Sequence, residues 1–178
     1  MKLRPARTMR YLKSQAWARY SVKRPRKNYV KALPHTSLIV FRMGVSKPDY
    51  NLLVTLNADQ YVQLRSNSLE AARQVANKHL EREMPANYFF RVVTYPHNVI
   101  REKKRATGAG ADRLSQGMSM SFGKPISVAA RVHRGQPVME IKVFDSQMAR
   151  QVAHEALKRA SSKLSGNYSI VASEINGS

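Results

Sequence analysis

The side chains of this chain that could do chemistry are mainly cations. The sequence has 31 Lys and Arg residues against 11 Asp and Glu residues, and it has no Cys. Thirteen of the cations and no acid fall in residues 1–48, and eight more fall in residues 101–134 beside Glu102 and Asp112. The rest of the chain is almost neutral. Two cationic segments on a balanced remainder are typical of a protein that binds a polyanion, with nucleic acid favoured.

The second cationic segment is also rich in glycine. Four cations lie at positions 101–105, and Gly108, Gly110 and Arg113 follow them. Glycine permits close approach of the backbone to a ligand, so we expect a functional loop over residues 101–117. Arg113 stands where a Walker loop needs its second glycine and where a dinucleotide fingerprint needs its third, so neither nucleotide motif is present. Asp112 is a candidate cap for a short helix that runs to about Met120.

The first cationic segment, residues 1–35, is predicted to be an extended basic arm. Pro5, Pro25 and Pro34 interrupt it, and it has no sustained helical or strand period. Four aromatic residues are interleaved with its cations: Tyr11, Trp17, Tyr20 and Tyr29. These rings could stack on RNA bases or pack on the protein's own body.

No constellation of residues predicts catalysis, a metal site or a cofactor. His97 has no carboxylate or nucleophile near it in sequence, so we expect it to act as a hinge or as a hydrogen-bonding partner of RNA. His154-Glu155 lacks the second His of a zinc-binding helix motif. The other histidines, His35, His79 and His133, are expected at the surface or in hydrogen bonds. The strong charge lies outside amphipathic helices, which argues against a membrane surface as the partner.

The elements that must position these segments follow one order in each half of the chain. In the first half we expect strands at 36–43, 51–55, 60–65 and 88–95, the middle two forming a hairpin around residues 57–59. A helix should begin at Asn67 in a capping box with Glu70 and end at Met84-Pro85. Its predicted apolar face is Leu69, Ala72, Val75, Ala76 and Leu80.

The second half repeats this pattern. Strands at 126–133 and 138–144 should form a hairpin around residues 134–137, and a helix capped by Asp145 or Ser146 should follow. Gly166 is expected at that helix C-terminus, and residues 168–173 form a closing strand. The predicted apolar face is Ala149, Val152, Ala153, Ala156, Leu157, Ala160 and Leu164. Two hairpin–helix–strand units indicate an α+β class with mostly antiparallel sheet, as a single domain over residues 36–178.

Several stretches of the sequence resemble one known family. They are Arg4-Pro5-Ala6-Arg7, Leu69-Glu70-Ala71-Ala72-Arg73, Arg91-Val92, Tyr95-Pro96-His97, Arg101-Glu102-Lys103-Lys104, Gly108-Ala109-Gly110-Ala111-Asp112-Arg113-Leu114, Gly117-Met118, Phe122-Gly123-Lys124-Pro125 and Ala129-Ala130-Arg131-Val132. Together they are similar to the universal large-subunit ribosomal protein sixteen family, in its archaeal L-ten-e form. The family usually has Arg after Gly117-Met118, where this chain has Ser119.

The resemblance implies an α/β hammerhead arrangement and a cytoplasmic, structural, non-enzymatic role in the large ribosomal subunit. It implies contacts with large-subunit rRNA, with neighbouring ribosomal proteins and with tRNA acceptor arms near the peptidyl-transferase centre. Contacts with the 5S rRNA region are also compatible with the resemblance. No cofactor, membrane or small-molecule substrate is implied. The residues expected to bind rRNA are Arg4, Arg7, Arg10, Lys13, Arg19, Lys23, Arg24, Arg26 and Lys27. The residues expected in the tRNA-proximal loop are Arg101, Lys103, Lys104, Arg105, Gly108, Gly110 and Arg113.

Two other function classes remain to be separated from this one. A free-standing RNA- or DNA-binding protein, such as a chaperone or chromatin component, would share the same composition. An RNA-acting enzyme would need paired carboxylates, a metal cluster or a His–nucleophile pair, and the cationic segments contain only two acids.

Overall fold

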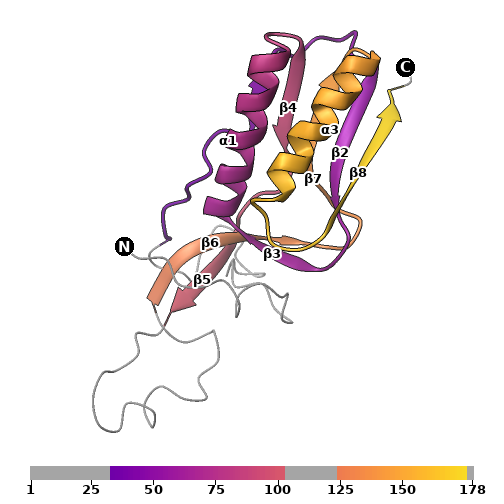
Figure 1. Ribbon diagram of the computed structural model, residues 1–178. Coiled ribbons are helices and arrows are strands. Elements are labelled where there is room, and N and C mark those ends of the chain that lie inside the picture. Colours follow the sequence, from indigo (N-terminus) through magenta and orange to yellow (C-terminus); the bar gives the residue numbers. More distant parts are fainter. Residues whose placement is uncertain (1–32, 103–123, 176–178) are drawn as a thin grey trace, which may run out of the picture.

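Two helices lie on one face of a five-stranded antiparallel sheet in the computed structural model, which describes residues 33–102 and 124–175 (Figure 1). The strand order is β1-β4-β7-β2-β8. The strands are β1 Arg42–Gly44, β4 Tyr88–Val92, β7 Pro137–Val143, β2 Leu52–Ala58 and β8 Tyr168–Glu174. The helices are α1 Ser66–Glu83 and α3 Gln147–Ser161, and they pack on each other. The α+β class with antiparallel sheet is therefore confirmed.

The main core lies between this sheet and the helices. Side chains of a strand alternate between its two faces, and on β2 the buried Leu52, Val54 and Leu56 alternate with half-buried residues. The helices contribute mostly alanine and leucine to the same core, including Ala76 and Ala153. On the face of the sheet that points away from the helices, the alternate residues of β2, β4 and β7 are only half buried.

Strands β3 Val62–Arg65, β6 Lys124–Val132 and β5 Asn98–Glu102 form a second sheet in the order β3-β6-β5. All its pairs are antiparallel. This sheet lies at the end of the main sheet near the start of α1, and β5 and β6 run together away from the helical layer (Figure 1). The strand at residues 98–102 was not predicted from the sequence.

Both predicted hairpins are wrong in their pairing, although their strands exist. β2 bonds to β7 on one edge and to β8 on the other, so no edge is free for β3. In the same way, β7 lies between β4 and β2, and β6 pairs with β3 and β5 instead. The expected turn at residues 134–137 is present, with Gly135 at φ 79°, but it passes the chain from one sheet to the other.

The main sheet consequently interleaves the two halves of the chain. β2 and β4 run parallel with β7 between them, and β7 and β8 run parallel with β2 between them. Each parallel pair is connected through a helix, which makes two interlocked split βαβ units.

The first predicted strand is shorter than expected and starts later. The hydroxyl of Thr36 bonds to the backbone of Leu38, a local bond that competes with extended pairing. β1 is confined to Arg42–Gly44 at the sheet edge. Gly44 has φ 78°, and a Cβ there would lie 2.2 Å from the carbonyl oxygen of Tyr88, so the close approach requires glycine.

The helix boundaries agree with the sequence in part. Ser146 caps α3, because its hydroxyl accepts a hydrogen bond from the Ala149 amide at 3.1 Å, and α1 ends before Met84-Pro85 as predicted. The Asn67–Glu70 capping box is wrong: β3 runs straight into α1, whose N-cap is Arg65. Gly166 has the expected positive φ, 110°, but lies in the turn before β8, beyond the α3 C-cap at Ser162.

Candidate nucleic-acid interface

Most residues predicted to bind RNA lie outside the described residues. This holds for all the arm cations, from Arg4 to Lys27, and for the loop residues at positions 103–113, together with the helix expected after Asp112. Arg101 belongs to strand β5, not to the irregular connection that was expected to begin there. β5 forms because Val99 and Ile100 are buried β-branched residues that pair with β6.

The structure does fix where the central connection leaves the body. Glu102 ends β5 and Lys124 begins β6, and their Cα atoms are paired across the two strands. At the other end of β5, the side-chain amide of Asn98 donates to the side-chain Oε1 of Gln63 on β3 at 2.6 Å, which joins the base of this ribbon to β3. Both ends of the connection 103–123 are therefore neighbours on one packed β-ribbon.

The open face of the main sheet carries a group of cations. Arg42 on β1 is the Cα partner of Arg91 on β4, and Lys142 on β7 lies on the same face. Glu140 accepts from Arg91 at 2.6 Å, and the Arg91 side chain remains 41% exposed. Among the residues that the structure describes, Arg42 and Lys142 have no acidic partner, so this face is net positive.

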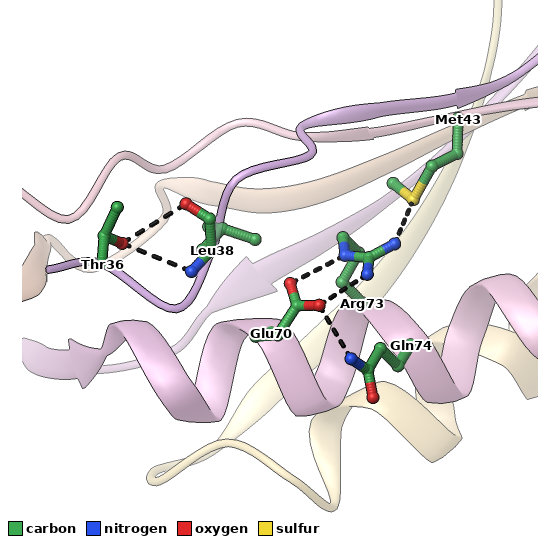
Figure 2. Close-up of polar contacts among 6 residues, drawn as sticks. All are labelled: Thr36, Leu38, Met43, Glu70, Arg73 and Gln74. Atoms are coloured by element: carbon green, nitrogen blue, oxygen red, sulfur yellow. Dashed lines mark hydrogen bonds and ion pairs between the residues drawn. The ribbon is translucent and has the colours of Figure 1, made fainter.

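The helical layer differs, because its arginines are largely neutralised by neighbouring acids. Two guanidinium nitrogens of Arg73 on α1 donate hydrogen bonds to the Glu70 carboxylate, at 2.6 and 2.8 Å. The third nitrogen lies 3.0 Å from the sulfur of Met43 (Figure 2). This guanidinium lowers the pKa of the Glu70 carboxyl below its usual value. Arg73 therefore joins α1 to the edge strand β1 and has little remaining capacity for phosphate.

The same neutralisation recurs along α3. Arg150 pairs with Asp145 at 2.5 Å, and Arg159 pairs with Glu155 one turn earlier. Both arginines line a groove of about 870 Å³ between α3 and β8, whose floor includes Val54, Ile170 and Ala172. Lys158 adds a cation to the rim. Because acids pair with two of the three Lys and Arg side chains that line it, the groove has only a weak net positive charge.

Three aromatic rings form a stack at the junction of the two sheets. The rings of Phe41 and Tyr95 have centroids 4.4 Å apart and planes inclined by 25°. The His97 ring lies 6.0 Å beyond Tyr95, inclined by 15°. Phe41 packs on the core, whereas Tyr95 is 49% exposed and His97 is exposed.

His79 is the histidine whose environment differs most from expectation. It is buried on α1, not at the surface, and its Nδ1 has no hydrogen-bond partner within the described chain. Burial lowers the pKa of the imidazole, and the positive charge of Arg159 on α3 lowers it further. The carboxylates of Glu155 and Glu83 oppose this effect but do not reverse it.

Within residues 33–102 and 124–175, no group of three His, Asp or Glu side chains is placed to hold a metal ion. None of the helices described is long and apolar enough to cross a membrane.

Comparison with known proteins decides the family. The model of the ribosomal protein L16p/L10e family matches residues 17–171. This chain belongs to that family. The resemblance seen in the sequence is therefore confirmed, and the L16p/L10e match runs from Trp17 in the arm, through the central connection, to Val171 within β8.

Individual L16p/L10e relatives support the match over most of their length. The large ribosomal subunit protein uL16 of Archaeoglobus fulgidus is 42% identical over 152 residues, which cover 85% of this chain and 86% of the relative. The protein of the same name from Hyperthermus butylicus is 42% identical over 165 residues, or 92% and 89% of the two chains. That of Methanococcus maripaludis is 39% identical over 165 residues, or 92% and 90%.

Two features of this L16p/L10e chain were missed by sequence reasoning. Strand alternation could have placed Arg91 and Lys142 on one face, but the partnership of Arg42 with Arg91 requires the pairing of β1 with β4. The stack of Phe41, Tyr95 and His97 joins residues more than fifty positions apart, and only the spacing of Tyr95 and His97 was a signal.

Proposed function

We propose that this protein, a structural constituent of the large ribosomal subunit, binds large-subunit rRNA through its basic arm and helps to position tRNA acceptor ends through residues 101–113. Membership of the family supports a place in the large subunit, and the distribution of positive charge supports electrostatic binding to RNA. The observation that carries the proposal is the pairing of Glu102 with Lys124, which brings the two ends of a cationic, glycine-rich segment together on one β-ribbon.

The binding would be chiefly electrostatic. Lys and Arg that neutralise phosphates release counterions, and Arg can bind a phosphate with two parallel hydrogen bonds. The arm contributes Arg4, Arg7, Arg10 and the basic residues up to Lys27, and the open sheet face adds Arg42 and Lys142. Neighbouring ribosomal proteins and the 5S rRNA region are further partners under this proposal. We infer that the protein acts by placing RNA and catalyses no reaction itself.

The test replaces Lys103, Lys104 and Arg105 together with Gln in the full chain. Each lost phosphate contact should reduce the slope of log K against log salt by about 0.7–0.9. The variant should still sediment with large subunits in sucrose gradients, because β5 and β6 are untouched, but those subunits should bind tRNA more weakly. A matched control replaces Lys78, Lys158 and Lys163, three helix-side cations, with Gln.

Equal tRNA binding by subunits that carry either triple variant would contradict the role of the connection. Stoichiometry separates the alternative class: a ribosomal constituent is present at one copy per large subunit, whereas a chaperone or chromatin component would be present in variable amounts. Detection of turnover on incubation of the pure protein with RNA would contradict the non-catalytic role.

A further inference from the structure

The stack of Phe41, Tyr95 and His97 reaches the protein surface, and electrostatic binding by Lys and Arg does not account for it. Its three rings are close to parallel, and they are ordered from the core outward: Phe41 packs on the core, Tyr95 is half exposed and His97 is exposed. A core cluster would bury its outermost rings, and an isolated exposed aromatic would lack a support. This stack instead ends in a supported ring at the surface.

The backbone on both sides of the stack is anchored. The carbonyl of Phe41 accepts from the Val92 amide at 2.9 Å, and the Val93 amide donates to the Val138 carbonyl at 2.9 Å. Thr94, directly before Tyr95, is 3% exposed. Pro96 fixes its own φ and biases Tyr95 towards extended backbone, where side chains two residues apart point the same way. The rings are thus held in position before any ligand arrives.

We propose that this stack receives an unpaired nucleobase of the rRNA, which would lie against His97 and extend the column by one more ring. Proteins recognise unstacked RNA bases by stacking them on Phe, Tyr, Trp or His side chains. The net charge of the chain, +20, favours a nucleotide over an apolar peptide as the ligand. This inference rests on the proposed rRNA binding and adds a specific contact to it.

Stacking and phosphate binding leave different signatures, and the experiment uses that difference. The full-length protein is titrated with deproteinised large-subunit rRNA at several salt concentrations. His97→Ala should weaken binding by about 5- to 150-fold at every salt concentration. The slope of log K against log salt should be unchanged, because no phosphate contact is lost. His97→Phe, which keeps a ring, should bind as the unaltered chain does.

The matched control is His133→Ala. His133 is also exposed and also touches an aromatic ring, but it meets Tyr61 edge-on at 86°, so the pair presents no parallel stack. This variant should retain full affinity. A second measurement irradiates assembled large subunits with ultraviolet light and maps nucleotide adducts by mass spectrometry. We expect an adduct on the peptide that contains Tyr95 and His97.

Two results would overturn the stacking site while leaving rRNA binding intact. One is that His97→Ala binds rRNA as tightly as the unaltered chain; the other is that His97→Phe loses as much affinity as His97→Ala. The absence of an adduct at residues 95–97 in subunits that contain the protein would do the same. If the unaltered chain fails to bind large-subunit rRNA at all, the proposed function fails together with this inference.

Discussion

At the scale of single residues, His79 couples the stability of the helical layer to pH. The imidazole is buried between α1 and α3, and its pKa is lowered, first by burial and then by Arg159. In the unfolded chain the pKa returns to about 6.5, so the unfolded state binds the proton more readily. The contribution is fully present above that pH, and the free energy of unfolding should decrease as the pH falls below it.

The measurement is chemical denaturation between pH 7.5 and pH 5. His79→Leu should keep stability at pH 7.5 within about 1 kcal/mol, because it removes a buried Nδ1 that has no partner among the described residues. It should also remove part of the loss at pH 5. His154→Gln, an exposed position on α3, should behave as the unaltered chain. The carboxylate of Glu70 has a lowered pKa and loses its contribution only below its ordinary value of 4.5, outside this window. An identical pH profile for His79→Leu and the unaltered chain would refute the coupling.

At the scale of elements, the alanine faces of the two helices determine how closely they approach each other and the sheet. Ala153 is fully buried in the core that α1 and α3 share. Ala153→Leu would add three carbons where the interior is already filled, and overpacking of this kind costs about 1–3 kcal/mol. We expect a lower denaturation midpoint for this variant in urea. Gln151→Leu, on the exposed side of the same helix, should change stability by about 0.5 kcal/mol or less. Equal effects of the two changes would show that the helix face is not tightly packed.

The elements also show what a sequence can predict here. Both helices, the turn at residues 134–137 and the cap at Ser146 depend on residues within a few positions of one another, and local spacing was enough to predict them. Strand pairing depends on residues far apart: the sequence around Leu52–Ala58 cannot reveal that both edges of β2 are taken by β7 and β8. The same holds for the candidate site. The positive charge of the arm and the connection can be predicted from the sequence, but the contact of Phe41 with Tyr95 depends on the fold.

At the scale of the whole molecule, the interleaved sheet makes the two halves of the chain interdependent. β2 and β4 contact each other only through β7, which lies between them and belongs to the second half. A fragment of residues 1–102 should therefore show no cooperative unfolding transition when monitored by circular dichroism. Mixing it with a fragment of residues 103–178 should restore one, because the break falls next to the paired residues Glu102 and Lys124. A cooperative transition for the first fragment alone would contradict this interdependence.

The position of β8 as the last of the described strands has a consequence for synthesis. Domains commonly fold from the N-terminus while translation continues, but β2 gains its second neighbour only when residues 168–174 have been made. Long-range pairings of this kind also fold slowly. A nascent copy would therefore hold β2 with one edge unpaired until β8 has been made. Shielding by a chaperone or by RNA is needed most during that interval.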